Sequence, residues 1–496
     1  MKGGVAHDRK GTQSIGAVAT RKITWATAEI AKRDAIIEAQ AIKIAKLEDR
    51  VRTLTAQLNT NSKNSSKPPS SDGLKKPAPK SLRRSSGKKP GGQNGHEGHG
   101  LTLKAEIDHT VVCLPDPCLE CSHCSTCSFQ VANRRNVIDL NIVVERVEYQ
   151  QMEALCPCKG GERLAGRFPE GVSGSKQYGP KLRALGAAMV TECAVGLEKA
   201  SQFLRGMTSC SLSKSTILNF LNSCKKTLEG PMEYLRREIL EKHVVNFDET
   251  GARVAGKLHY LHNASTADTT YQTTSAHRGR KGMDSGRVLP FYEGIAVHDC
   301  LASYWLYEGI ASHGVCCAHL LRECKGLQEM HPESVFFRYF PVLLKEMLNA
   351  KKKRMQYHKE DAGRYYLKKY MSLYDLLVDV GRLEHPPIER EEKKKGRKAR
   401  GKANAFVERM AHLKDAVCLF FCSFAVPFDN NQAERDLRHA KVKLKVSGCF
   451  RTEEGFELFA QMNSFLNTAK KRGHSALQAL EALFQNTPML VLTGGD

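Results

Sequence analysis

Three acidic residues lie where predicted strands and a predicted helix could bring them together. Asp248 follows the predicted strand 244–247, and Asp299 follows the short predicted strand 295–298, 51 residues further on. Glu434 lies on a later predicted helix. Two acids at strand ends and one on a helix can hold two Mg²⁺ or Mn²⁺ ions, which prefer oxygen ligands. Such a pair, about 4 Å apart, activates a water or a 3′-hydroxyl for phosphodiester displacement.

Each acid also has an ordinary interpretation. Asp248 could be a turn residue, Asp299 could be a surface residue, and Asn431-x-x-Glu434 matches a helix capping box. Composition alone does not single out these three among 53 Asp and Glu residues. The choice of these three acids depends on their places relative to five predicted strands of a mixed sheet, which indicate an α/β domain. These strands are 244–247, 257–262, 269–273, 295–298 and 314–318.

Basic residues follow Glu434 closely. Because Arg438 and Lys441 come at three- or four-residue steps after it, one helical face would carry an acid and then two cations. Phosphate contact beside the metal ions is the favoured interpretation, and a solvated helix face is the alternative. The basic residues concerned are Arg435, Arg438, Lys441, Lys443 and Lys445. On an earlier predicted helix, His319 and Arg322 could contact the scissile phosphate or merely pack.

Cysteine spacing predicts a structural zinc site. Three consecutive C-x₂-C steps are followed by a C-x-C pair, after an alternating stretch 138–144 that predicts a strand. Two pairs of thiolates supply all four ligands of a tetrahedral, structural Zn²⁺ site. A catalytic zinc would need an open coordination position, and the sequence gives no sign of one. The simplest ligand set is Cys118, Cys121, Cys156 and Cys158, with Cys124 and Cys127 as alternates.

A second group of possible metal ligands lies further along the chain. It spans a predicted strand and the helix after it, so its side chains should point in different directions, and it lacks a paired spacing. We therefore expect no metal site among His313, Cys316, Cys317, His319 and Cys324.

The N-terminal 105 residues predict two segments. Over residues 20–60 a seven-residue apolar repeat favours a coiled coil that pairs subunits, and the alternative is an amphipathic helix packed on its own chain. Residues 61–105 are rich in Ser, Gly, Pro and basic side chains, which predicts a flexible linker that contacts phosphates or is a solvated tether. The repeat consists of Ile23, Ile30, Ile37, Ile44, Val51 and Leu58.

The remaining chain divides by pattern into further parts. The region 171–235 is predicted to be helical. A helix from Leu197 breaks at Gly206, and a second short helix is capped by Ser213. This pattern is compatible with a DNA-binding helix-turn-helix, although any two packed helices look similar. The other predicted parts are a zinc-binding module over 106–170, a catalytic domain over 240–325 and 415–470, a helical basic insertion over 326–414, and a C-terminal helix and tail over 471–496.

The charge favours a polyanionic partner. Lys and Arg number 76 against 53 Asp and Glu, a net charge of +23. Residues 1–100 carry +12 of it and residues 351–402 carry +9. DNA is preferred to a membrane surface, because no stretch approaches the roughly 18 apolar residues of a membrane helix. The start lacks a signal peptide, so we expect a cytoplasmic protein. The sequence lacks the phosphate-binding motif G-x-x-x-x-G-K-[ST], so it does not indicate ATP-driven chemistry.

Ordered sequence blocks add a family resemblance. The motifs 61–73 (NSKNSSKPPSSDG) and 91–99 (GGQNGHEGH) precede 247–251 (FDETG), 297–299 (VHD), 317–323 (CAHLLRE), 427–438 (PFDNNQAERDLR) and 447–451 (SGCFR). From about residue 25 to 485, this order resembles the insertion sequence 66 family of bacterial transposases.

The resemblance implies a DDE transposase with a ribonuclease H-like, retroviral integrase-like catalytic domain. The acids of that motif fall on Asp248, Asp299 and Glu434, and the helical segment becomes an insertion before the last catalytic helix. The family's zinc module places its paired cysteines on Cys118, Cys121, Cys156 and Cys158, whereas Cys124 and Cys127 depart from its pattern.

The resemblance also implies partners. These are the terminal inverted repeats of a mobile element, target DNA, a second subunit joined by the coiled coil, and small accessory proteins, in a nucleoid-associated bacterial setting. Two other functions stay open: a catalytically inactive DNA-binding protein derived from a transposase, and a ribonuclease H-like nuclease that cuts without joining.

Overall fold

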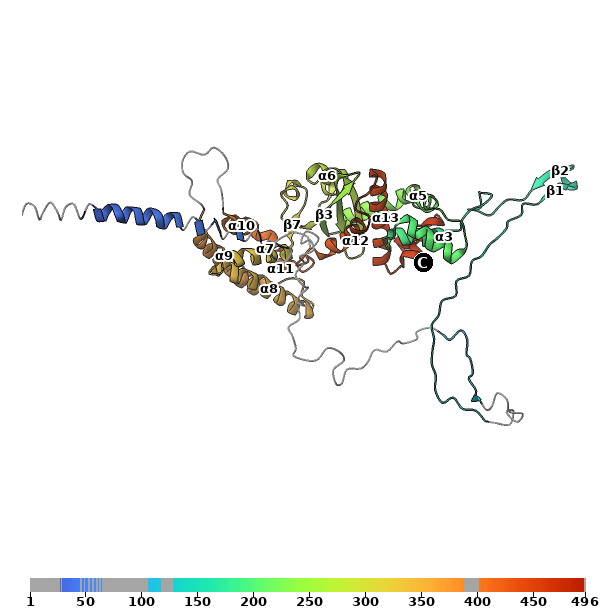
Figure 1. Cartoon of the computed structure of the whole chain (residues 1–496), viewed down its shortest axis with the longest axis horizontal. Coiled ribbons are helices and arrows are strands. Elements are labelled where there is room, and N and C mark those ends of the chain that lie inside the picture. Colours follow the sequence, from blue (N-terminus) through green and yellow to red (C-terminus); the bar gives the residue numbers. More distant parts are fainter. Residues whose placement is uncertain are drawn as a thin grey trace, which may run out of the picture. The chain divides into compact units, whose positions relative to one another are not determined.

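The chain forms two units, each described here by itself (Figure 1). The computed structural model describes residues 27, 29–44, 47–48, 50–51, 54–55, 58, 61 and 64, and then 106–116, 128–387 and 401–494. The larger unit comprises Met1–Leu74, Gly171–Gly206 and Cys210–Asp496, and the smaller comprises Lys75–Glu170 and Met207–Ser209. Most of the predicted linker, and the basic run 391–400, lie outside the described residues.

The N-terminal segment is helical over residues 29–44, as the seven-residue repeat predicts. Its apolar repeat positions are exposed, with Ile37 at 62% and Ile44 at 56% of their surfaces. A helix that exposes such a stripe does not pack it on its own chain, which favours the intermolecular coiled coil. The coiled coil itself stays a prediction.

In the smaller unit, a hairpin carries one predicted cysteine pair. Strand β1 (Glu153–Cys156) pairs antiparallel with β2 (Glu162–Ala165), and a 3₁₀ turn over Pro157–Lys159 joins them. Cys156 ends β1 and Cys158 lies in the turn, so a tight turn presents both thiols. Cys118, Cys121, Cys124 and Cys127 lie outside the described residues.

The strand predicted over 138–144 is wrong. These residues adopt no regular structure, and Ile138 and Leu140 are largely exposed. An alternating pattern stabilises a strand only when a neighbouring strand accepts its hydrogen bonds. Within the described part of this unit, the strands β1 and β2 pair only with each other.

The larger unit is built on a five-stranded mixed sheet in the order β5-β4-β3-β6-β7. Its antiparallel part and its parallel part share β3. The strands are β3 (Val244–Val254), β4 (Lys257–Ser265), β5 (Thr270–Ser275), β6 (Ile295–His298) and β7 (Ser312–Val315). All five predicted strands are therefore present, and the expected mixed sheet is confirmed.

Two predicted strand ends need correction. Strand β3 does not end at Asp248, because β4 pairs with it as far as Val254 and keeps it extended. The parallel partner β6 pairs with β3 only over 244–246. Strand β7 ends at Val315, and Cys317 already begins the next helix rather than extending the strand.

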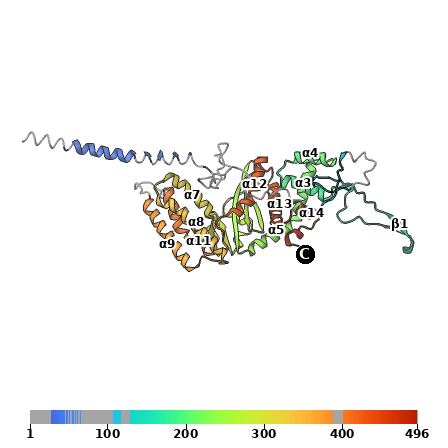
Figure 2. The ribbon, with the colours of Figure 1, turned by 90° about the horizontal axis from the view of Figure 1, so that it is seen from below.

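Helices gather at both edges of the sheet and over its middle (Figures 1 and 2). Helix α11 packs on β7, α13 and α5 pack on β5, and α12 covers β3 and β4. At the β5 edge lie α3 (Pro180–Thr191), α4 (Leu197–Thr208), α5 (Lys214–Glu241), α13 (Glu453–Lys471), α14 (Ala476–Phe484) and α15 (Leu490–Thr493). The others are α6 (Arg280–Ser285), α7 (Cys317–Met330), α8 (Val335–Gln356), α9 (Gly363–Glu384), α10 (Lys402–His412), α11 (Lys414–Cys422) and α12 (Asn431–Ser447).

The predicted helix-turn-helix region differs in detail. The Ser213 hydroxyl accepts a hydrogen bond from the Thr216 N–H at 3.1 Å, so the predicted cap is confirmed. Gly206 does not break α4, which continues to Thr208, because one helical glycine costs only about 1 kcal/mol. Helix α5 is not short: it runs for 28 residues and buries an apolar stripe against its own unit.

The helical insertion shares a core with the sheet. Aromatic side chains of α8 and α10, including Phe336, Phe340 and Phe406, pack in one cluster with Val297 of β6 and Val315 of β7. The insertion is therefore packed firmly on the parallel edge. No helix of the described residues is long and apolar enough to cross a membrane.

Ile37→Asp tests the coiled coil. A charge placed in the apolar seam loses its hydration on association, so we expect self-association to weaken about tenfold or more. Ala39→Asp, two positions away and outside the repeat, is the matched control and should leave association unchanged. Analytical ultracentrifugation of the full chain measures both, and equal behaviour of the two variants would contradict the coiled coil.

Candidate active site

The register of the parallel strands sets Asp248 level with Asp299. Strands β3 and β6 pair Val244 with Ile295 and Asn246 with Val297. The same offset carried two residues further places Asp248 beside Asp299, which follows the last residue of β6. Carboxyl ends of parallel strands meet at one edge, so the structure brings these two predicted residues together.

Glu434 joins them from the first turn of α12. The pKa of Asp248 is raised well above its usual range, first by burial and then by repulsion from Glu249, Asp299 and Glu434. The other two predicted acids therefore both act electrostatically on Asp248. Lys441 opposes this repulsion, because its ammonium lowers the pKa of Asp248.

Two side chains of α7 contact the Glu434 carboxylate. Arg322 donates to Oε1 at 3.3 Å, and His319 Nε2 lies 3.7 Å from the same oxygen. Both predicted residues therefore lie at the Glu434 carboxylate. Burial, followed by the Arg322 charge, lowers the pKa of His319, which favours a neutral imidazole.

The start of α12 is tied to β3 by Asn430. Its side-chain amide donates to the Phe247 carbonyl at 2.7 Å, and its Oδ1 accepts from the Asn246 amide at 2.8 Å. The capping-box interpretation of Glu434 is wrong, because Asn430 is the cap residue and its side chain makes no capping hydrogen bond. An Asn between apolar residues of a strand was the sequence signal for this link.

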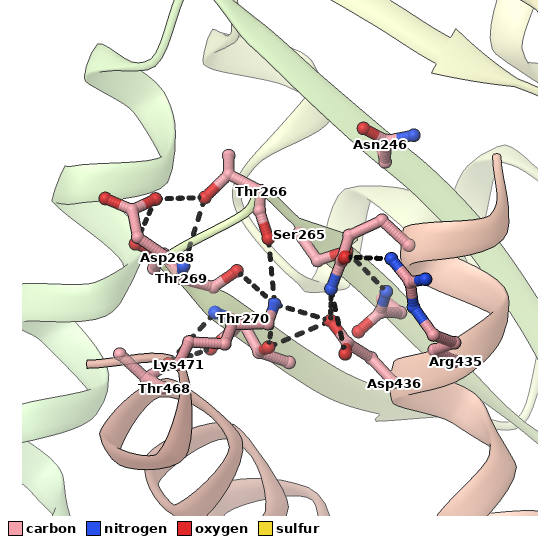
Figure 3. A network of polar contacts seen from close by, with 12 residues as sticks. Asn246, Ser265, Thr266, Asp268, Thr269, Thr270, Arg435, Asp436, Thr468 and Lys471 are labelled. Carbon is pink, nitrogen blue, oxygen red and sulfur yellow. Dashed lines mark hydrogen bonds and ion pairs between the residues drawn. The ribbon is translucent and has the colours of Figure 1, made fainter. Parts of the chain in front are cut away.

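A buried ion pair holds α12 on its other side (Figure 3). Lys471 of α13 donates to Asp436 Oδ2 at 2.8 Å and to the Thr270 hydroxyl at 2.7 Å. Asp436 also accepts from Thr270 at 2.9 Å. Burial lowers the pKa of Lys471, and the Asp436 charge opposes this effect. Since Asp436 is two residues after Glu434, the network fixes the helix that presents the acid.

Sequence reasoning missed Glu249, which lies on the opposite face of β3 from Asp248. Its side chain is only 2% exposed, pairs with Arg278 at 2.8 Å and accepts from Tyr304 at 2.8 Å. Burial, together with repulsion from Asp299, raises the pKa of Glu249. Nothing in the sequence distinguished this acid from its neighbour.

The predicted basic face of α12 is largely solvent-accessible. Arg435, Arg438 and Lys445 are exposed, and Lys441 is half-buried. Arg438, Lys441 and Lys445 follow Glu434 at helical spacing, so this stripe leads away from the acids. Lys443 differs: it is partly buried and donates to the Val190 carbonyl at 3.5 Å, which is a packing role.

The second group of possible ligands divides in two. His313 pairs with His298 at 2.9 Å, and Cys317 and Cys324 are buried in the core. Cys316 and His319, however, converge with Glu434, and their ligand atoms lie within 4.8 Å of one another. The expectation that strand and helix would separate all these side chains is therefore wrong for Cys316 and His319.

Residues 175–458 match the family model described as "Transposase IS66 family", which covers more than half of the 496-residue chain. The chain belongs to the IS66 family of transposases. The match contains Asp248, Asp299 and Glu434 together with the insertion, and it confirms the resemblance. A second model, described as a family of unknown function (DUF6444), matches residues 21–102. No curated protein matches the chain.

Membership of this family makes the protein a nucleic-acid-processing enzyme that binds DNA. The family also suggests a requirement for divalent metal, and the site fits one: several buried or half-buried carboxylates repel one another, and a bound cation would relieve that repulsion.

Lys471→Met tests how this transposase holds α12. Removing one partner leaves the Asp436 carboxylate buried without its cation, so we expect the free energy of unfolding to fall by about 3 kcal/mol. Lys470→Met is the matched control, because Lys470 forms a more exposed pair with Glu192 and should cost under about 1 kcal/mol. Urea unfolding measures both, and equal losses would contradict an anchoring role.

Proposed function

We propose that this transposase cleaves DNA strands and joins them to target DNA at a site formed by Asp248, Asp299 and Glu434. One observation carries the proposal. Asp248 on β3 lies near Asp299, which directly follows the adjacent parallel strand β6, and Glu434, from a helix anchored to β3, repels Asp248. Strand transfer, rather than cutting alone, is proposed because of the family.

The catalytic domain is proposed to be ribonuclease H-like, with the helical insertion before α12. The mixed sheet and the acids at the end of its parallel part support this fold. The helical segment predicted over 326–414 supports it too, since its helices α8, α9 and α10 lie in the chain between α7, which follows β7, and α11, which precedes α12. The sheet would then present the acids while the insertion stays packed against the parallel edge.

Two Mg²⁺ or Mn²⁺ ions are proposed to be held by the three carboxylates. When bound, they would supply an activated water or 3′-hydroxyl and stabilise the leaving oxygen. Oxygen ligands select these ions over zinc. Asp299 Oδ1 accepts from the Leu301 N–H at 2.8 Å, which fixes the direction of this carboxylate before an ion arrives.

The cationic side chains are proposed to position the scissile strand. Arg322 lies at Glu434, and Lys441 acts electrostatically on Asp248, so both charges face the reacting phosphate. Arg435, Arg438 and Lys445 would hold phosphates further along. These contacts fix register on the backbone without reading sequence.

Recognition of the terminal inverted repeats is assigned to the parts before the sheet. The basic linker, the zinc-binding module and the helices α4 and α5 are the candidates. The coiled coil would pair two subunits, because two element ends must meet in one complex. The zinc ligands are proposed to be Cys118, Cys121, Cys156 and Cys158, of which the last two lie together on the β1–β2 hairpin.

Strand transfer in vitro tests the catalytic proposal. With the element's terminal repeats and Mg²⁺, wild-type protein should join DNA, and Asp248→Asn should reduce joining by about a thousandfold or more, because a metal-holding carboxylate is lost. Asp375→Asn, a charge-matched change on the surface of α9, should leave the rate unchanged.

Three outcomes would overturn this assignment. Joining by Asp248→Asn at the wild-type rate would remove the metal mechanism. Cutting of supercoiled plasmid without joining would identify a nuclease. Specific DNA binding by wild type without cutting would identify a binding protein.

Cys156→Ser tests the zinc module. The module should hold about one zinc, so the variant should contain about one zinc fewer per chain than wild type by metal analysis. Cys113→Ser, an exposed thiol outside the predicted ligand set, is the control and should retain the wild-type content. Folded wild-type protein free of zinc would contradict the module.

A further inference from the structure

Three side chains of different chemistry converge where α7 begins and α12 passes. Cys316 precedes α7, His319 lies in its first turn, and Glu434 comes from α12. One ligand atom from each lies within 4.8 Å of the other two, and His319 Nε2 is already 3.7 Å from Glu434 Oε1. Ligands around a tetrahedral zinc are about 3.5 Å apart, so closing this cluster on an ion needs only small side-chain movements.

The polar atoms of the cluster show an incomplete environment. His319 Nδ1 is buried and has no hydrogen-bond partner, which is so for only two other buried side-chain polar atoms among the described residues. Buried polar atoms without partners are rare in folded proteins and often mark a ligand site. The Cys316 sulfur accepts from the Asn430 N–H at 3.1 Å. Burial raises the pKa of this thiol to about 12, and the Asn430 contact only partly opposes that shift, so the sulfur is a thiol until a cation replaces its proton.

We propose that Cys316, His319 and Glu434 form a regulatory site for a thiophilic divalent cation, Zn²⁺, distinct from the cysteine module. A thiolate, an imidazole and one carboxylate are zinc ligands, whereas Mg²⁺ avoids sulfur. Three protein ligands leave a fourth position for water. Binding replaces the Cys316 thiol proton, which is released to solvent, with a sulfur–zinc bond.

The site shares Glu434 with the proposed Mg²⁺ centre. Zinc would draw this carboxylate toward α7 and separate it from Asp248 and Asp299, and it would displace Arg322, which now donates to Glu434. We therefore expect zinc to inhibit Mg²⁺-dependent strand transfer. This consequence rests on the proposed function, whereas zinc binding does not.

Cobalt binding tests the site without using activity. Full-length protein is stripped with EDTA and titrated with Co²⁺, whose thiolate charge-transfer absorption in the near ultraviolet reports sulfur ligation. Cys316→Ser should lose part of this absorption and weaken one class of Co²⁺ sites about tenfold or more, while the sites of the cysteine module remain.

Cys317→Ser is the matched control. This neighbouring thiol faces the Val315 and Val417 carbonyls rather than the cluster, so its variant should keep the wild-type spectrum. His319→Gln serves as a second variant should Cys316→Ser not fold, and it should also weaken one class of sites. Spectra and site numbers identical to wild type in the folded variants would overturn the proposal.

A second arm measures regulation. With millimolar Mg²⁺ present, micromolar Zn²⁺ should slow strand transfer by wild type and Cys317→Ser about tenfold, and the ratio of rates with and without zinc should approach one in Cys316→Ser. Equal inhibition of all three proteins would overturn regulation through this site. Absence of strand transfer from wild type would refute the proposed function, and the cobalt titration would still decide the zinc site.

Discussion

Mutual repulsion among carboxylates is the constraint that the larger unit has to satisfy. Asp248 is half-buried near Glu249, Asp299 and Glu434, and each of these charges raises the cost of ionising it. Bringing these like charges together costs free energy of folding, so other interactions must hold the elements that carry them. Pairing over residues 244–246 holds β3 to β6, and the same register continued by two residues sets Asp248 beside Asp299, which directly follows β6.

Helix α12 needs separate anchors, because Glu434 reaches the acids from a segment far away in sequence. Asn430 ties the start of the helix to the backbone of β3, and Asp436 ties its other face to Lys471 of α13. Arg322 neutralises Glu434 from the side of α7. Three independent contacts thus hold one helical turn against repulsion, which is the preorganisation expected of a centre that stabilises charge during phosphoryl chemistry.

The sequence was most informative where a signal is local. The apolar strand before Asp299 and the serine cap at Ser213 were both predicted from neighbouring residues. The end of β3 was not, because its length depends on β4, and a residue pattern does not reveal how far a partner strand extends. The convergence of Cys316 with Glu434 was missed for a similar reason: its two segments meet only in the folded chain.

The central claim is that a bound divalent cation offsets the repulsion among the clustered carboxylates. Thermal unfolding with and without Mg²⁺ tests this claim without relying on DNA. Because the fold raises the pKa of Asp248, this group loses its contribution to stability as pH rises above the ordinary carboxyl range, where the unfolded chain ionises first. At neutral pH and without metal, Asp248→Asn should therefore melt at a higher temperature than wild type, and Mg²⁺ should raise the melting temperature of wild type more than that of the variant. A variant that melts lower than wild type in EDTA, with the same response to Mg²⁺, would contradict the account.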